Sequence, residues 1–343
     1  MCCLNELKIS VVIPVHNGGM NFRKCLLSLA EAKPPPHELI VVVDGSRDGS
    51  SPIAKEFEAR VLELPESGGP ARARNLGARM AEGDILFFVD ADVSISSDAV
   101  SQVANAFNRK PELVAVIGSY DDEPSASNFL SQFKNLFHHY VHQRADEKAF
   151  TFWGACGAIR KKTFLFMGGF EESYKKPSIE DIELGYRLKK DGHSIRLIKS
   201  LQVKHLKRWG LLSLLKSDIF QRALPWTKLI LHTRLFVNDL NLKTSDRISV
   251  ILIYGLLGAL ISALLWPGFV LLAGALAISL FLLNTKLYRF FRQKRGLWFA
   301  IRSLPWHWFY FLYSGFAFTV GTVAYLLGNC FMPGKTSHGA PWG

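Results

Sequence analysis

The chain of 343 residues changes character near residue 248, and this change limits what it can fold into. Three apolar stretches follow that point, at residues 248–265, 268–283 and 306–331, each near the ~20 residues that a helix needs to cross a bilayer. These stretches hold too few polar residues to favour the alternative, a buried helical domain. We therefore expect three transmembrane helices, with the first two joined as a tight hairpin.

A basic segment between the second and third apolar stretches sets the expected orientation. Residues 284–303 contain six Lys or Arg and no acidic residue, which is typical of a loop on the cytoplasmic side. Residues 1–8 lack the apolar core of a signal peptide, so the first domain should stay in the cytoplasm. We expect a multi-pass protein of the inner (cytoplasmic) membrane, with its catalytic domain facing the cytoplasm and its C-terminus outside.

The net charge of +12 does not indicate nucleic-acid binding, because of where the charge lies. Residues 241–343 carry nine Lys or Arg and one Asp, a net charge of +8, and residues 1–240 carry the other +4. The excess thus flanks the apolar stretches, where it suits anionic lipid headgroups. The cysteines are scattered without metal-site spacing, so neither a disulfide framework nor a zinc site is expected: Cys2, Cys3, Cys25, Cys156 and Cys330.

The part before residue 248 alternates short apolar runs with segments of helical spacing. Residues 9–15, 39–43, 60–64 and 85–89 are such runs. Strands that are buried on both faces and alternate with helices form a mostly parallel sheet in an α/β fold. Ligands of such sheets bind at the carboxyl ends of the strands.

The expected organisation has four parts. Residues 1–203 form the α/β domain, and residues 204–247 form an amphipathic linker at the membrane surface. Residues 248–331 hold the three transmembrane helices, and residues 332–343 form a tail.

Two aspartates follow the fourth apolar run, at Asp90 and Asp92. Side chains at positions i and i+2 of an extended segment point to the same side. A pair of carboxylates there suits Mg²⁺ or Mn²⁺ carrying a diphosphate. An ordinary turn at the end of a strand is the alternative, since Asp is common in turns.

Two further motifs carry possible chemistry. A glycine turn at Gly68 and Gly69 leads into a helix with Arg72 and Arg74, which favours an anion, although a plain helix start is the alternative. At residues 180–181, Glu180 and Asp181 either begin a helix, with Ser178 as its cap, or supply a general base.

These motifs occur in an order that resembles glycosyltransferase family 2, which has the GT-A fold, a Rossmann-like, mostly parallel sheet for nucleotide-diphospho-sugars. The resemblance covers about residues 8–198. It rests on these segments: SVVIPVHN at 10–17, VVVDGSRDGS at 41–50, ARNLG at 73–77, GDILFFVDAD at 83–92, GGFEE at 168–172 and EDIEL at 180–184.

The resemblance implies a single-sugar transfer with inversion, from a UDP-, GDP- or dTDP-sugar, with Mg²⁺ or Mn²⁺. It implies that Asp181 is the general base, with Glu180 as second choice, and that Asp92 binds the metal. The donor side would comprise Pro14, Asn17, Asp44, Arg74 and Asp90. For the acceptor, expected to be a membrane lipid or lipid-linked, we assign Trp153, Gly154, His205 and Trp209. For His205 and Trp209 the favoured alternative is an ordinary exposed histidine and an interfacial tryptophan.

Two departures from the family pattern bear on function. Val43 stands where many relatives carry an Asp before Asp44, a departure that bears on recognition of the nucleobase. The Gln-x-x-Arg-Trp motif of processive synthases is disturbed at residues 221–226, where Arg222 is misplaced and Pro225 intrudes. The sequence thus favours transfer of one sugar over two alternatives, a processive polysaccharide synthase and a catalytically inactive nucleotide-sugar-binding membrane protein.

Overall fold

The four early apolar runs form one half of a mixed nine-stranded sheet. The computed structural model describes residues 7–238 and 240–328, so the end of the third expected membrane helix and the tail lie outside the described residues. The strand order is β3-β2-β1-β4-β8-β6-β9-β5, with β7 paired to β9. The strands are β1 (Ile9–Val15), β2 (Glu38–Asp44), β3 (Arg60–Leu64), β4 (Ile85–Val89), β5 (Val93–Ile95), β6 (Ala115–Tyr120), β7 (Lys148–Ala149), β8 (Cys156–Arg160) and β9 (Ile195–His205).

The first four strands run parallel, as the sequence predicts. β1 pairs with β2 on one side and with β4 on the other, and β2 pairs with β3. Their carboxyl ends therefore meet at one edge of the sheet, where Asp44 ends β2 and Asp90 follows β4. Helices cover both faces: α1 (Gly19–Ala30), α2 (Ser50–Glu56), α3 (Pro70–Met80), α4 (Ala99–Arg109), α5 (Phe129–Gln143), α6 (Lys161–Phe166) and α7 (Glu180–Lys190).

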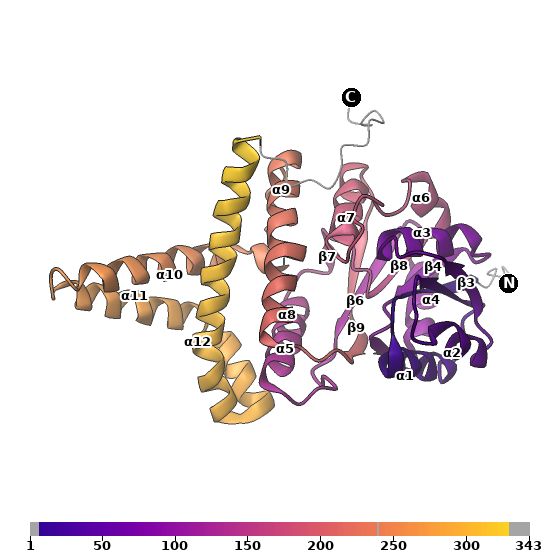
Figure 1. The fold of residues 1–343 in the computed structure, drawn as a ribbon, viewed down its shortest axis with the longest axis horizontal. Helices are drawn as coiled ribbons and strands as arrows, with labels where there is room; N and C mark the ends of the chain where they lie inside the picture. The colour runs from indigo at the N-terminus through magenta and orange to yellow at the C-terminus, as the bar shows by residue number, and fades with distance from the viewer. Residues whose placement is uncertain (1–6, 239, 329–343) are drawn as a thin grey trace.

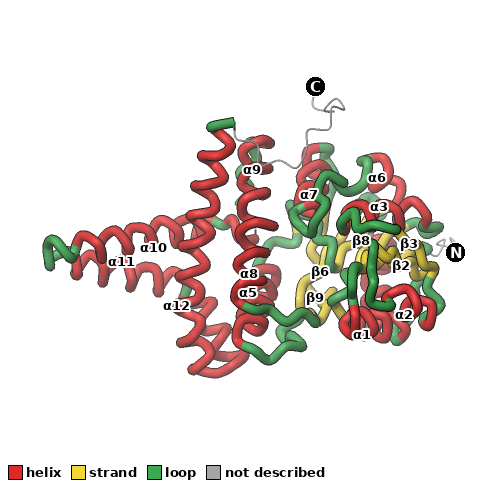
Figure 2. The backbone as a smooth tube through the Cα atoms, viewed as in Figure 1, coloured by secondary structure: helices red, strands yellow, loops and turns green. Residues whose placement is uncertain are grey.

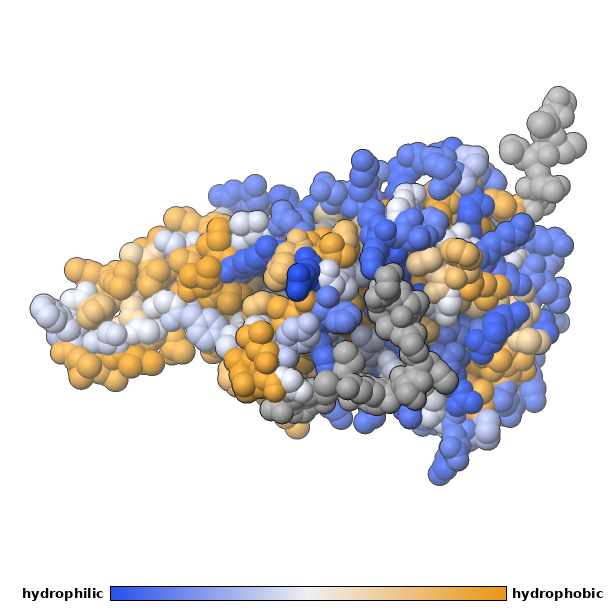
Figure 3. Space-filling model, turned by 90° about the horizontal axis from the view of Figure 1, so that it is seen from above, coloured by the Kyte–Doolittle hydropathy of each residue, from blue (hydrophilic) through white to orange (hydrophobic). Residues whose placement is uncertain are grey.

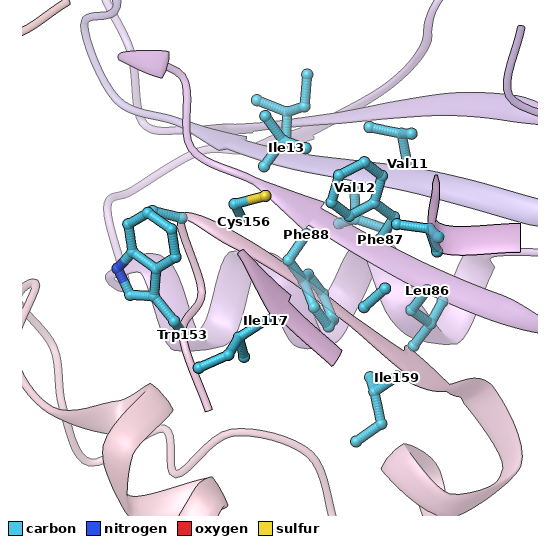
Figure 4. Packing of buried hydrophobic residues seen from close by; sticks show 14 of the residues in the cluster. Val11, Val12, Ile13, Leu86, Phe87, Phe88, Ile117, Trp153, Cys156 and Ile159 are labelled. Atoms are coloured by element: carbon cyan, nitrogen blue, oxygen red, sulfur yellow. The ribbon is translucent and has the colours of Figure 1, made fainter. Parts of the chain in front are cut away.

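The core lies between these layers and is dense in aromatic rings. Phe88 of β4 packs against Phe164 at 5.2 Å and Phe170 at 5.1 Å between ring centroids. Figure 4 shows it among buried aliphatic side chains of β1, β4 and β8. On the same face of the sheet, where Val12 is in register with Phe88, Gly77 lets α3 approach closely, because an added Cβ would lie only 2.4 Å from Val12 Cγ1. This packing holds the start of α3 at the carboxyl edge of the sheet.

The other half of the sheet is partly antiparallel. β8 lies antiparallel between β4 and β6, and β9 pairs with both β6 and the short β5. Val93 of β5 is in register with His205 of β9, and the Leu206 amide donates to the Asp92 carbonyl over 2.8 Å. This pairing brings two segments together that are more than a hundred residues apart in the sequence.

The C-terminal region is helical. The expected amphipathic linker contains α8 (Leu211–Lys216), a π-helix η1 (Ser217–Ala223), α9 (Leu224–Thr233) and a 3₁₀-helix η2 (Leu240–Leu242). The apolar stretches form α10 (Thr244–Ser262), α11 (Phe269–Leu283) and α12 (Thr285–Leu326). Figure 2 shows this helical region beside the sheet domain.

The expected basic loop at residues 284–303 is wrong in its conformation, because this segment is the start of α12. Lys and Arg are good helix formers, and the apolar residues between them pack on α5. Leu287, Tyr288 and Phe291 are buried there against Phe133 and Phe137. The helix is interrupted at Gly296, whose φ of 83° reverses the direction of the chain.

α10 and α11 form the expected hairpin, and it projects away from the sheet domain (Figure 1). α12 after Gly296 does not run alongside the hairpin but crosses its base, where Tyr254 Oη donates to the Leu312 carbonyl over 2.9 Å. Exposed apolar side chains cover the hairpin up to its tip, where Leu265 is 92% exposed (Figure 3). By length and composition, α10 and α12 suffice to cross a membrane, and α11 is a shorter apolar helix.

Candidate active site

The carboxylate of Asp44 is bound to the turn that begins α3. It accepts hydrogen bonds from the Gly68 amide at 2.7 Å, the Gly69 amide at 2.9 Å and the Ser67 hydroxyl at 2.9 Å. Gly69 has a φ of 92°, a conformation that suits glycine. Asp44 therefore fixes the glycine turn at the carboxyl edge of the sheet, and its predicted contact with a nucleobase remains a prediction.

The other donor-side residues predicted from the first strand lie beside this turn. Pro14 is near the end of β1, opposite Val42 of β2. Asn17 has a φ of 51°, and its side-chain oxygen accepts from the Arg47 amide over 2.9 Å. This hydrogen bond ties the loop after β1 to the loop after β2, so both loops form one rim of the site.

Arg74 joins the two carboxylate motifs. Its guanidinium donates to Asp90 Oδ1 over 2.6 Å and to Glu180 Oε1 over 2.9 Å. The side chains of Arg74 and Glu180 are both 5% exposed. Glu180 Oε2 also accepts from the Ser178 amide over 2.9 Å, so both of its oxygens are engaged. This geometry makes Glu180 a buried partner of Arg74.

Asp181 lies beside this ion pair in a different environment. Its Oδ2 accepts from the Gly154 amide over 2.9 Å, and its Oδ1 accepts from the Ile182 amide over 2.8 Å. Burial, followed by the charge of Glu180, raises the pKa of Asp181 to about 6. A carboxylate with such a pKa is ionised at neutral pH and is a better proton acceptor than an ordinary aspartate.

The capping box at Ser178 is wrong. Among the residues that the structure describes, no side chain caps the start of α7, and the Ser178 hydroxyl donates to the Gln221 carbonyl over 2.9 Å instead. The carboxylate of Asp181 is turned toward Gly154, which is why it cannot complete a box. The helix itself begins at Glu180 as expected, and its Glu183–Arg187 pair forms with a closest distance of 2.7 Å.

Asp92 lies next to His205, which we had assigned to the acceptor side from the sequence. His205 Nε2 is 3.8 Å from Asp92 Oδ2. Burial raises the pKa of Asp92, but the contact with His205 and the charge of Lys207 act together in the other direction, so that the pKa is lowered overall. Among residues 7–238 and 240–328, no group of three His, Cys, Asp or Glu side chains is placed to hold a metal.

The residues therefore fit a metal only if the ligand supplies most of its oxygens. Mg²⁺ is often bound in this way, by one or two protein side chains together with substrate phosphates. Asp92, with a side chain that is 34% exposed, and His205 are the two side chains that could take part.

The predicted acceptor-side residues surround Tyr120 of β6. The His205 ring stacks on Tyr120 at 4.4 Å, and Trp153 meets Tyr120 edge-on at 4.9 Å. Trp209 lies 6.2 Å from His205, measured between ring centroids. Trp153 directly precedes Gly154, which holds Asp181, so this aromatic cluster adjoins the carboxylate.

Two cations of the linker also face the site, and the sequence did not single them out for it. The positive charge of Lys207 lowers the pKa of Asp92, and that of Arg222 opposes the raised pKa of Asp181. Within the part of the chain that the structure describes, Arg222 makes no hydrogen bond or ion pair through its side chain. From the sequence we considered Arg222 only as a displaced motif residue. The structure places it in η1, directly after Gln221, whose carbonyl accepts from the Ser178 hydroxyl.

A mixed sheet with carboxylates at the ends of its parallel strands defines a nucleotide-diphospho-sugar-binding fold of the GT-A type. Comparison with known proteins agrees, because residues 10–166 match the model of Glycosyl transferase family 2. Over these residues, which make up less than half of its length, the chain is similar to glycosyltransferase family 2.

Two curated relatives illustrate the extent of the similarity. Glycosyltransferase GlyG of Streptococcus pneumoniae is 30% identical over 131 residues, which are 37% of this chain and 43% of GlyG. The probable glycosyltransferase YdaM of Bacillus subtilis is 29% identical over 205 residues, 55% of this chain and 48% of YdaM. The chain thus spans less than half the length of these relatives.

Solved structures share the fold at low sequence identity. The mannosyltransferase PcManGT from Pyrobaculum calidifontis, solved with GDP-Man and Mn²⁺, superposes with a TM-score of 0.51 and 16% identity. The alignment covers 95% of this chain and 89% of PcManGT.

Proposed function

We propose that this chain is an inverting glycosyltransferase that moves one sugar from a UDP-, GDP- or dTDP-sugar to a hydroxyl of a membrane-associated, lipid-linked acceptor. The observation that carries the proposal is the position of Arg74. It binds Asp90 and Glu180, and its own pKa is raised by carboxylates that include Asp181. Arg74 therefore links Asp90, at the end of β4, to Glu180, the neighbour of the expected base Asp181.

In the proposed reaction, Asp181 accepts the proton of the acceptor hydroxyl. The hydroxyl oxygen forms a bond to the anomeric carbon, and the bond from that carbon to the diphosphate oxygen breaks on the opposite face. The configuration therefore inverts, and a nucleoside diphosphate leaves. The Gly154 amide orients Asp181, and the buried Arg74 keeps Asp90 in place at the donor side.

Asp92 and His205 are the residues that would hold Mg²⁺ or Mn²⁺. When bound, the metal offsets the negative charge on the leaving diphosphate. Support comes from the pairing of β5 with β9, which holds Asp92, directly before β5, beside His205 at the end of β9. Mn²⁺ and a nucleotide sugar are bound by PcManGT, whose fold this chain shares.

We also propose that the hairpin of α10 and α11 inserts into the membrane. The 19 residues of α10 are about 28 Å long, close to the ~30 Å of a bilayer core. The hairpin projects on the side opposite the sheet domain, so the membrane would face α12 and leave the active site in water. A membrane-bound acceptor would then reach the site along the linker that carries Lys207 and Arg222.

The proposal is tested by incubating purified full-length protein with labelled UDP-, GDP- and dTDP-sugars and a membrane lipid extract. We expect one donor to yield a lipid-extractable product carrying one sugar, and no product with Asp181→Asn. A polymer from wild-type protein would support a processive synthase instead. Donor binding without hydrolysis or transfer would support an inactive sensor.

A further inference from the structure

A groove between α5 and α12 lies outside the active site. It has a volume of about 440 Å³, within the range of small-molecule sites. One wall belongs to the catalytic domain and the other to the helical region. The lining residues are His139, Tyr140, Gln143, Arg144, Lys286, Arg289, Phe290 and Gln293.

The groove is aromatic at its base and cationic at its rim. The Phe290 ring lies 5.9 Å from His139 and 5.3 Å from Tyr140, between centroids. Arg144, Lys286 and Arg289 are exposed at the rim. None of these three cations forms an ion pair with any residue in the described ranges 7–238 and 240–328. The nearby Asp246 reaches Tyr140 only through its charge.

The cations of the basic segment 284–303 are of two kinds, those that contact residues of the catalytic domain and those that do not. Lys294 pairs with Asp122, Arg295 donates to Gln132 Oε1 over 2.7 Å, and Arg302 lies 4.6 Å above the Phe129 ring. These three fasten α12 to the catalytic domain. Lys286 and Arg289 have no such partner within residues 7–238 and 240–328, so their charge is available to an anion.

The groove also lies at a defined depth relative to the hairpin. α11 ends at Leu283, and Lys286 follows three residues later, so the groove opens at the root of the hairpin. If the hairpin inserts as proposed above, its root is at the level of the lipid headgroups. Cations at this depth attract anionic lipid.

We propose that this groove binds the headgroup of an anionic phospholipid, whose phosphate bridges Arg144 of the catalytic domain and Arg289 of the membrane anchor. The acyl chains would extend along the apolar hairpin, and the headgroup would lie on Phe290. This inference rests on the membrane insertion proposed above and not on the transferase activity. A lipid held in this way fixes α5, whose other face carries His138 against Trp153 of the active site at 5.1 Å.

The test uses purified full-length protein from nanodiscs of phosphatidylcholine mixed with phosphatidylglycerol, and native mass spectrometry counts the lipids retained on release. We expect wild type to retain phosphatidylglycerol in preference to phosphatidylcholine. The double variant Arg144→Gln/Arg289→Gln should bind it about 30-fold more weakly, since each cation near a membrane surface contributes about a fivefold factor. Arg292→Gln is the matched control, because Arg292 is exposed on the same helix but does not line the groove.

Equal retention by the double variant and Arg292→Gln would overturn the proposal, because it would mean that only the diffuse charge of α12 attracts lipid. Displacement of the lipid by inorganic phosphate alone would also overturn it, in favour of a free-anion site. Unchanged circular dichroism and nucleotide binding show that the double variant is folded. If the wild-type protein shows no transferase activity, the proposed function is rejected, but the lipid measurement still tests the groove.

Discussion

Arg74 of α3 and Glu180 of α7 form a buried ion pair with a distance of 2.9 Å, although they are 106 residues apart in the sequence. The pair joins the glycine turn to the helix that carries the expected base. Burying two charges costs free energy, and removal of one partner leaves the other charge buried without compensation. Its role in holding the site together can be measured.

We expect Arg74→Met to destabilise the catalytic domain by about 3–5 kcal/mol, because Glu180 is then left buried without a partner. The double variant Arg74→Met/Glu180→Gln should recover part of this loss, since it removes the unpaired charge. The midpoint of chemical unfolding in detergent measures both. Arg72→Met, on the exposed side of the same helix, is the control and should stay within about 0.5 kcal/mol of wild type.

For Asp181 we expect the substitution Asp181→Asn to lower the transfer rate by about 10²–10⁴-fold, because an amide cannot accept the proton of the acceptor. The protein should remain folded, since the amide oxygen can still accept from Gly154. Nucleotide affinity should change little. Asp191→Asn at the other end of α7 is the matched control. Normal turnover by Asp181→Asn would remove Asp181 from the reaction.

The pH dependence of transfer follows from the raised pKa of Asp181. Only the ionised carboxylate accepts a proton, so we expect the rate to fall as the pH drops through about 6 and to level off above it. The raised pKa also means that ionised Asp181 costs folding stability above its unfolded pKa, and the cost grows up to about pH 6. Asp181→Asn should therefore be at least as stable as wild type at pH 8. A transfer rate that is flat between pH 5 and 8 would contradict the first expectation, and an Asp181→Asn variant less stable than wild type at pH 8 would contradict the second.

The metal assignment predicts that a chelator abolishes transfer and that Mn²⁺ or Mg²⁺ restores it. Asp92→Ala should be inactive at any metal concentration. His205→Gln should require about tenfold more metal for half-maximal rate, because one of two protein ligands is lost. His193→Gln, at a histidine that pairs with Asp191 away from the site, should behave as wild type. Full activity in the chelator would reject the metal site.

The sequence predicted the parallel half of the sheet well, because each of its strands is a continuous apolar run between helices. It could not predict that Asp92 and His205 lie side by side. Their contact depends on β5 pairing with β9, and strand pairing over such a distance leaves no periodic pattern in the sequence. Hydropathy likewise gave the lengths of the apolar helices but not the angle at which α12 crosses the hairpin.

The same limit explains the interpretation of Ser178 as a cap. Ser178 and Asp181 have the spacing of a capping box, and local spacing was all that the sequence offered. Tertiary contacts decide otherwise, because the Gln221 carbonyl and the Gly154 amide are better partners in the folded chain. Ser178 and Asp181 thus contact residues that are distant in the sequence instead of forming the local cap that their spacing predicts.

The last prediction concerns topology, for which two arrangements make opposite forecasts. Three parallel spans would place the C-terminus outside the cytoplasm. If instead the hairpin alone inserts and α12 lies along the membrane surface, the chain returns to the side from which it entered. The crossing of α12 over the hairpin base favours the second arrangement.

Labelling with a membrane-impermeant maleimide on intact cells distinguishes the two arrangements. The background is a variant with Cys2, Cys3 and Cys330 replaced by serine, in which Cys25 and Cys156 stay buried. Pro341→Cys should be protected until the cells are permeabilised, as should Arg292→Cys. Trp266→Cys, at the hairpin tip, should react in intact cells if the hairpin spans the bilayer. Immediate labelling of Pro341→Cys would establish three spans, because only a third crossing brings that end of the chain outside.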